Sequence, residues 1–282
     1  MLLGQSLPTV LAELRDGDEL VVVDSASVSA DVRPLVERLG ATYLRVDEPG
    51  LSRARNAGWR ASRHPLVLCT DDDCHPLPGW RDAGARALAD PGVGAVWGSV
   101  LPDRDSAIPL SVGLSDLREL TADSDLSMAG HGACMGFRRE ALEALGGFDV
   151  LLGAGGRFRS GEDKDAFDRI RRNGWRVVAA PAMAVTHVVH RDDTAARRVM
   201  TGYGVGAGVI VRKRAAEGDP GLRLLLSELW RHGVKPAWWW AKERRFAAAL
   251  GALTRGAGVL QGWWSVRDWA LANGHLQDPK GA

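Results

Sequence analysis

Three consecutive aspartates, Asp71 to Asp73, end a short apolar stretch and are well placed for chemistry. Residues 66–69 are too few and too uniformly apolar for an amphipathic helix, and prolines bound them, which predicts a buried strand. In an extended backbone Asp71 and Asp73 share one face and Asp72 points away. Two carboxylates so placed can bind a hard divalent cation that keeps positions open for phosphate oxygens. The alternative is a solvated acidic turn, since aspartate favours turns.

A second group of residues, Arg53, Arg55 and Asn56, lies in the first turns of a predicted helix that follows a proline-glycine turn. The helix macrodipole disfavours positive charge near an amino terminus, so the two arginines predict a nearby anion. The alternative is that they pair with Asp47 or Glu48. The helix leads into the strand before the aspartates, so phosphate-binding and metal-binding residues would meet, and a nucleotide diphosphate would satisfy both.

Acidic residues also open a helix predicted over residues 162–173, directly after a glycine-rich loop at residues 153–161. Glu162 and Asp163 lie in its first turn and arginines in its last, an order that the macrodipole explains without any chemistry. His187 follows an apolar strand. A single histidine at a strand end is more often a satisfied polar residue than a ligand.

The elements that must position these residues alternate between helices and strands. Helices are predicted at residues 3–14, 31–39, 79–89, 138–145 and 162–173, and strands at 19–24, 42–46, 66–69, 93–100, 177–180 and 183–186. The β-branched run 19–24 ends at Asp24, the first candidate ligand contact. The βαβ order predicts an α/β fold, a Rossmann-like and mostly parallel sheet flanked by helices. Residues 102–126 lack periodicity, which favours a functional or mobile segment.

Composition limits the class of protein. With 282 residues, 45% of them hydrophobic, the chain can build one large domain or one domain with an appended subdomain. The net charge of +1 gives no overall field for nucleic acid. Three cysteines without metal-ligand spacing indicate free thiols in a reducing compartment. No secretory signal and no uncharged apolar run of about 18 residues occurs, so we expect a cytoplasmic protein.

The C-terminal part differs in composition, because seven of the eleven tryptophans lie after residue 192, among arginines. Residues 246–264 contain Arg255 and several glycines and would span a membrane poorly. Their aromatic and basic mixture suits a helix at a membrane surface, and the alternative is packing on the main domain. The glycines of residues 202–208 resemble a nucleotide-binding fingerprint, but they are far from the opening βαβ unit and are not expected to bind phosphate.

Four motifs, taken in order, give the chain a family resemblance. They are Val-Val-Val-Asp-Ser-Ala-Ser at residues 21–27, Gly-Leu-Ser-Arg-Ala-Arg-Asn-Ala-Gly at 50–58, Thr-Asp-Asp-Asp-Cys-His-Pro-Leu-Pro-Gly-Trp at 70–80, and Ser-Gly-Glu-Asp-Lys-Asp at 160–165. With them the sequence resembles a family 2 glycosyltransferase of the GT-A fold over residues 3–191. A helical, Trp/Arg-rich extension would follow over residues 192–282, similar to membrane-proximal tails of some members.

The resemblance implies an inverting, hexosyltransferase-like enzyme with a nucleotide-sugar donor and a divalent metal, Mn or Mg. The implied roles are Asp24 near the base, Arg55 and Asn56 near the nucleoside, Asp71 and Asp73 as metal motif with His187 completing the shell, and Asp163 as general base. Arg53 and Asp72 are further candidates for nucleotide-sugar binding, and Glu162 for catalysis. The acceptor, whether glycan, lipid-linked or small molecule, stays open. Peripheral contact through the C-terminal helices would place the protein at the inner face of the cell membrane.

One departure from the family pattern concerns the start of the chain. Members normally open with a strand and a Pro-Thr-x-Asn-like loop that forms half of the nucleoside pocket, whereas this sequence starts at the following helix. We therefore expect either an upstream start or an incomplete pocket. The alternative functions are a degenerate, non-catalytic membrane-associated scaffold and a nucleotidyltransferase, which should carry a glycine-rich loop after its first strand. An Asp-dependent phosphotransferase would need an activating lysine and a second acidic cluster.

Overall fold

The computed structural model describes residues 2–103, 118–188 and 193–279 of the chain. These residues form two compact units. The first comprises Met1–Pro49, Arg53–Phe148 and Ala166–His190, and the second Gly50–Ser52, Asp149–Asp165 and Arg191–Ala282. Most of the irregular segment 102–126 and the predicted domain boundary at residue 191 lie outside the described residues.

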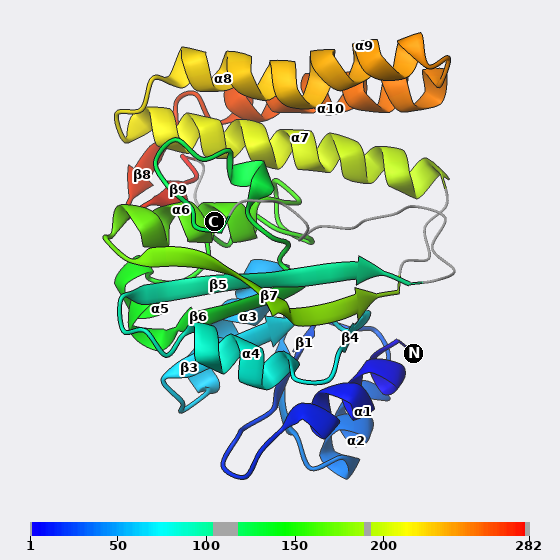
Figure 1. Ribbon diagram of the computed structural model, residues 1–282, viewed down its shortest axis with the longest axis vertical. Helices are drawn as coiled ribbons and strands as arrows, with labels where there is room; N and C mark the ends of the chain where they lie inside the picture. Colours follow the sequence, from blue (N-terminus) through cyan, green and yellow to red (C-terminus); the bar gives the residue numbers. More distant parts are fainter. Residues whose placement is uncertain (1, 104–117, 189–192, 280–282) are drawn as a thin grey trace. The chain divides into compact units, whose positions relative to one another are not determined.

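A five-stranded sheet in the order β3-β6-β5-β7-β4 forms the centre of the first unit (Figure 1). Its strands are β3 (Leu66–Thr70), β4 (Cys74–Pro76), β5 (Val93–Pro102), β6 (Cys134–Arg138) and β7 (Arg176–His187). Strands β5 and β7 are parallel, and the other neighbours are antiparallel. A separate parallel pair joins β1 (Val21–Ser25) to β2 (Thr42–Val46). The α/β class is confirmed, but the sheet is mixed and not mostly parallel, because β6 runs opposite to both of its neighbours.

Helices flank these strands close to where the sequence predicts them. They are α1 (Leu3–Glu13), α2 (Val32–Arg38), α3 (Leu51–Ala61), α4 (Trp80–Ala87), α5 (Arg139–Leu145) and α6 (Glu162–Arg172), with a 3-10 turn at Leu126–Met128. Helix α6 buries Ala166, Phe167 and Ile170, as its periodicity predicts. The Phe167 ring stacks on Phe137 of β6 at 5.9 Å between centroids, which fixes this helix against the sheet.

Glycines interrupt β5 as the sequence indicates, yet the strand continues through them. Register shifts against β7 fall at Gly94 and Gly98. A Cβ on Gly98 would lie 2.0 Å from the Met183 carbonyl oxygen, so the close approach of β7 requires glycine. The two strands predicted around Pro181 are one strand with a bulge, and Ser99 Oγ donates to the Pro181 carbonyl at 3.0 Å there.

The second unit is mainly helical. Its elements are α7 (Asp193–Ala216), α8 (Gly221–Leu229), a π-helical turn (Trp230–Val234), α9 (Lys235–Lys242), α10 (Phe246–Ser265) and a hairpin of β8 (Ala270–Ala272) and β9 (His275–Gln277). The segment from α8 to α9 is continuous helix over residues 221–242, and α10 runs beside it and along α7 (Figure 1). The predicted C-terminal helical extension is confirmed.

The glycines of α7 serve helix packing. A Cβ on Gly204 would lie 2.1 Å from the Arg255 carbonyl oxygen, and one on Gly208 would lie 2.0 Å from that of Val259. These positions allow α7 and α10 to approach closely, which explains the fingerprint-like spacing without a phosphate. Among the described helices, none is long and apolar enough to cross a membrane.

Candidate active site

The Asp triplet lies in a turn between β3 and β4. The Cys74 amide donates to the Asp71 carbonyl oxygen at 3.1 Å and closes this turn. The expectation of an extended segment with alternating side chains is therefore wrong, and the alternative of an acidic turn describes the backbone. Both ends of the turn are held by the sheet, since β3 pairs with β6 and β4 pairs with β7.

Asp71, at the start of the turn, contacts the arginine predicted to lie near it. Arg55 of α3 reaches the Asp71 carboxylate at 3.0 Å and donates to the Gly132 carbonyl oxygen at 2.9 Å. The Arg55 side chain is largely buried. Arg53 instead pairs with Glu48 at 2.8 Å, as the alternative interpretation expected. The structure thus brings Arg55 into contact with the triplet and pairs Arg53 with Glu48.

Asp73, at the end of the turn, meets His187. Nε2 of His187 lies 3.1 Å from Oδ2 of Asp73, and the Val188 amide donates to the Asp73 carbonyl oxygen at 2.9 Å. Burial alone would raise the pKa of Asp73, but the hydrogen bond and charge of His187 bring it below its usual value. The carboxylate is therefore ionised at neutral pH.

These residues have the chemistry of a divalent metal site. Ligand atoms of Asp73, Cys74 and His187 all lie within 4.8 Å of one another. Burial and the charges of Asp71 and Asp73 raise the pKa of Cys74, so it stays a thiol and a poor ligand. Carboxylate oxygens with one imidazole suit a hard or borderline cation. Loss of solvation and the same two neighbouring charges raise the pKa of Asp72.

A histidine that sequence analysis missed lies beside this group. The His131 and His187 rings are 6.1 Å apart, and Nδ1 of His131 accepts the Ala133 amide hydrogen bond at 3.1 Å. This bond leaves the proton of a neutral ring on Nε2. The available signal in the sequence was a histidine in residues 128–137, a segment that three glycines interrupt. A Cβ on Gly130 would lie 2.4 Å from Trp97, so that glycine serves packing.

Two residues predicted to contact the nucleotide, Asp24 and Asn56, form hydrogen bonds with other residues of the protein. Asp24, at the end of β1, accepts from Tyr43 Oη at 2.7 Å and from the Ser27 amide at 2.8 Å, and pairs with Arg45 at 3.0 Å. Against the effect of burial, these partners lower the pKa of Asp24. Asn56 is buried and bonds both backbone groups of Phe148 at 2.8 Å. In this structure both residues stabilise the fold.

The acids predicted for catalysis open α6 and belong to the second unit. Glu162 and Asp163 are both buried. The Lys164 amide donates to Oδ1 of Asp163 at 2.8 Å, and its ammonium lies 3.6 Å from Oδ2. Gly153, Gly155 and Gly161 of the preceding loop have positive φ, which the tight path of the chain requires.

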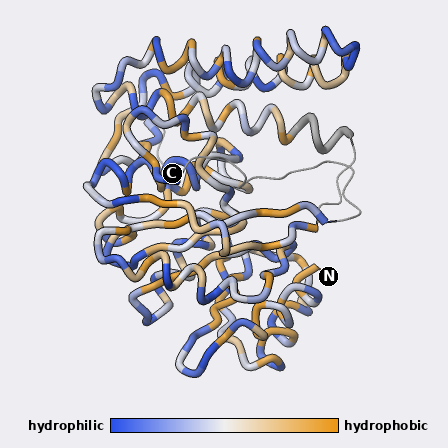
Figure 2. Tube along the Cα trace, viewed as in Figure 1, coloured by the Kyte–Doolittle hydropathy of each residue, from blue (hydrophilic) through white to orange (hydrophobic). Residues whose placement is uncertain are grey.

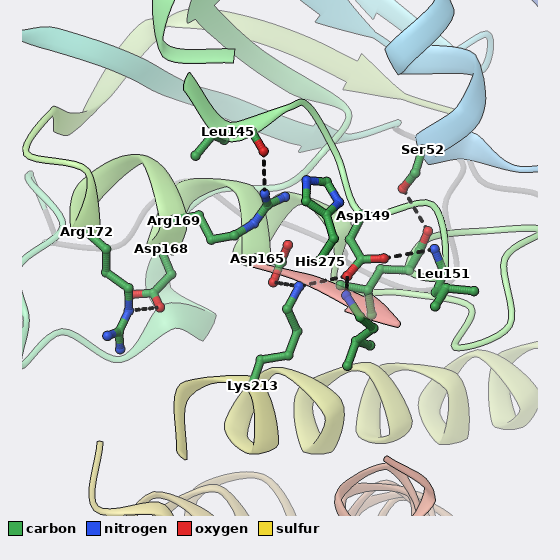
Figure 3. A network of polar contacts seen from close by, with 12 residues as sticks. Ser52, Leu145, Asp149, Leu151, Asp165, Asp168, Arg169, Arg172, Lys213 and His275 are labelled. Carbon is green, nitrogen blue, oxygen red and sulfur yellow. Dashed lines mark hydrogen bonds and ion pairs between the residues drawn. The ribbon is translucent and has the colours of Figure 1, made fainter. Parts of the chain in front are cut away.

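A buried ion cluster, also missed in the sequence, fixes the same part of the second unit (Figure 3). Lys213 of α7 lies 2.5 Å from Asp165 and 2.9 Å from Asp149, and all three side chains are nearly inaccessible. Asp149 also accepts from the Leu276 amide at 3.0 Å. The cluster therefore ties the start of α6 to α7 and to the terminal hairpin. A single lysine in an arginine-rich helix gave no signal for it.

The mixed sheet with a carboxylate turn after β3 is the architecture of a GT-A glycosyltransferase. A model of one family, glycosyl transferase family 2, matches residues 2–146, which is more than half of the chain. The chain belongs to this family, and the predicted resemblance is confirmed. A search of the curated proteins finds no match.

Solved structures show the same fold at low identity. The mannosyltransferase PcManGT from Pyrobaculum calidifontis, in complex with GDP-Man and Mn²⁺, is 18% identical, with 94% of this chain and 83% of that chain covered and a TM-score of 0.59. S. aureus TarS 1–349 with UDP-GlcNAc is 13% identical, with 97% and 91% covered and a TM-score of 0.53. GalNAc-T7 with UDP, GalNAc and Mn²⁺ is 16% identical, with 76% and 48% covered and a TM-score of 0.53.

Proposed function

We propose that this family 2 glycosyltransferase moves a sugar from a nucleotide-diphosphate sugar to an acceptor hydroxyl, in a single displacement that inverts the anomeric carbon. The observation that carries the proposal is the turn at residues 71–73, where Asp71 meets Arg55 and Asp73 meets His187. Similar folds hold GDP-Man or UDP-GlcNAc, which supports a nucleotide-sugar donor and a hexosyltransferase-like activity.

Asp71, Asp73 and His187 would hold a divalent cation, Mn or Mg. The ionised Asp73 carboxylate beside an imidazole fits such an ion, and two of the similar structures contain Mn²⁺. When bound, the cation would supply positive charge for the leaving diphosphate. Arg55 adds a fixed guanidinium at the same turn. Asp24, Arg53, Asn56 and Asp72 stay predicted as residues around the nucleotide sugar.

Asp163 acts as the general base in this proposal. It takes the proton of the acceptor hydroxyl while the acceptor oxygen bonds to the anomeric carbon and the bond from that carbon to the diphosphate oxygen breaks. The Lys164 amide, 2.8 Å from Oδ1, orients the carboxylate. Glu162 is the second candidate for this role.

Location and organisation complete the proposal. We assign residues 1–191 to a catalytic GT-A domain and residues 192–282 to an extension that contacts a membrane peripherally. Cys69, Cys74 and Cys134 are free thiols, which supports a cytoplasmic protein at the inner face of the membrane. The acceptor class, glycan, lipid-linked or small molecule, stays open.

Thermal unfolding of the chain with GDP or UDP, each with and without MnCl₂, tests the proposal. A metal-dependent rise in melting temperature is expected, because the nucleotide binds the folded state alone. The same nucleotide's sugar should then be consumed in a hydrolysis or transfer assay. Absence of both effects with every nucleotide tried would favour the non-catalytic scaffold.

A further inference from the structure

Large apolar side chains face solvent in two rows on the second unit. The first row, on the helix of residues 221–242, contains Leu222, Leu226, Trp230, Val234 and Trp238, and the second row, on α10, contains Phe246, Leu250, Leu253, Leu260 and Trp264. Their exposed fractions lie between 49% and 69%. Soluble monomers rarely expose large apolar patches, and such patches usually mark interaction sites.

Each row follows its helix. The second row repeats with an average period near the about 3.6 residues of an α-helical turn, so it runs straight along α10. The first row repeats every four residues, which would rotate it by about 40° per step in a regular α-helix. The π-helical turn at Trp230–Val234 holds more residues per turn and counters this rotation. Figure 2 shows hydrophobic and hydrophilic positions alternating along these helices.

Other positions of each helix pack inward. Leu225, Gly233 and Ala237 are buried on the first helix, and Gly256, Val259 and Gly262 are buried on α10. Both helices therefore carry apolar side chains on the packed side and on the solvent side, and the exposed rows are what remains after packing. This arrangement combines the two interpretations of the tail, since the helices pack and still present an apolar surface.

Positive charge accompanies the rows. Residues 221–268 contain eight Lys and Arg against three Asp and Glu, a net charge of +5, while the rest of the chain carries −4. Arg223 and Lys235 are exposed next to the first row. Lys242 lies 5.6 Å from the Trp238 ring and Arg245 lies 4.3 Å from that of Trp240. Basic and tryptophan side chains together are typical of helices in the headgroup region of anionic membranes.

We propose that the two rows and their basic neighbours dock on an anionic lipid bilayer, with both helices lying in the plane of its interface. The proposal deepens the membrane contact proposed above and does not depend on catalysis. A second copy of the chain is a poorer occupant, because each copy would bring a net charge of +5 to the interface. The α10 row also lacks the charged flanking pairs that specify coiled-coil partners.

Sedimentation with vesicles of phosphatidylcholine, with or without phosphatidylglycerol, tests the proposal on the full chain. The protein should bind the anionic vesicles and bind them more weakly in high salt. Arg223→Glu with Lys235→Glu should weaken this binding at least about tenfold, at about 1 kcal/mol per basic residue near the surface. Trp230→Ser with Trp238→Ser should weaken it as well.

A matched control reverses two exposed arginines of the first unit, Arg38→Glu with Arg86→Glu, and changes net charge equally. Its binding should stay within about twofold of the original chain, because neither arginine belongs to the two rows or to their basic neighbours. Absence of vesicle binding, or equal losses in the control, would overturn the proposal. So would a concentration-dependent dimer in analytical ultracentrifugation that the tryptophan variant abolishes, since the second copy would then be the occupant.

Discussion

The outer carboxylates of the Asp triplet each have a positive or protonatable partner. Asp71 has Arg55 at 3.0 Å, and Asp73 has His187 at 3.1 Å. A cation bound by Asp73 and His187 would replace the direct contact between these two side chains. Asp72 lies between them in the sequence. The hydrogen bond that closes the turn joins the backbones of Asp71 and Cys74 and does not involve Asp72.

Alanine substitutions in the triplet should affect metal-dependent nucleotide affinity more at the two outer aspartates than at the central one. Asp71→Ala or Asp73→Ala should lower metal-dependent nucleotide affinity by about 100-fold, because a removed ligand costs at least as much as a removed second-sphere partner. Asp72→Ala should have a milder effect. Isothermal titration of the nucleotide with MnCl₂ measures this, and equal tolerance of all three changes would exclude the metal site.

Contacts between individual residues could be predicted where the chemical types matched and the elements follow one another in the sequence. The proximity of Arg55 to the triplet follows from α3 leading into β3, so it could be foreseen. The hydrogen bonds of Asp24 and Asn56 within the protein could not be foreseen, because Tyr43, Arg45 and Phe148 reach them only through tertiary contacts. The same holds for Lys213, whose partners lie far away in the sequence.

Individual helices and strands follow hydrophobic periodicity closely. Strand β2 has the predicted bounds, and the helices whose bounds were predicted, α1, α2, α4, α5 and α6, each end within two residues of those bounds. Strand direction was harder to foresee, because β6 pairs antiparallel with both β3 and β5 and such pairing depends on contacts across the chain. The turn at residues 71–73 was missed for the same reason, because its two ends are held by pairing of β3 with β6 and of β4 with β7.

Helix packing in the second unit predicts opposite effects for two glycines. Gly208→Ala should destabilise the protein by about 1 to 3 kcal/mol or more, because its Cβ would lie 2.0 Å from a carbonyl oxygen of α10. Gly251→Ala, within α10, has nothing within 4 Å and should stabilise by up to about 1 kcal/mol through helix propensity. Urea unfolding of both variants measures this. Equal effects would contradict the close contact of α7 with α10.

The buried ion cluster predicts a pH dependence of stability. Asp149 is almost fully buried, yet Lys213 and the amide donors lower its pKa. A lowered folded-state pKa contributes stability that is present above the unfolded value of about 3.9 and is lost as pH falls through the folded value. Asp149→Asn should therefore cost about 3 kcal/mol at neutral pH and progressively less below about pH 4. Urea unfolding across this range gives the test, and a pH-independent difference would contradict the ionised pair.

Charge is unevenly distributed over the whole molecule. The net charge of +1 is the sum of +5 on residues 221–268 and −4 on the rest of the chain. The overall composition therefore gave no sign of an anionic partner. The family match ends at residue 146, whereas the candidate base and the C-terminal helices come later. The family assignment thus rests on the first half of the chain, and the proposed base and membrane contact lie outside the matched residues.

The measurement that tests the central claim most directly is nucleotide release from a panel of nucleotide sugars, in MnCl₂ and in EDTA, by the original chain and by Asp163→Asn. The chain should release nucleotide from at least one donor, and EDTA should stop the reaction. Asp163→Asn should lower turnover by about 100-fold or more and leave nucleotide affinity nearly unchanged, while Glu162→Gln should be less severe. Full turnover by a folded Asp163→Asn protein, or turnover that is unaffected by EDTA, would contradict the account.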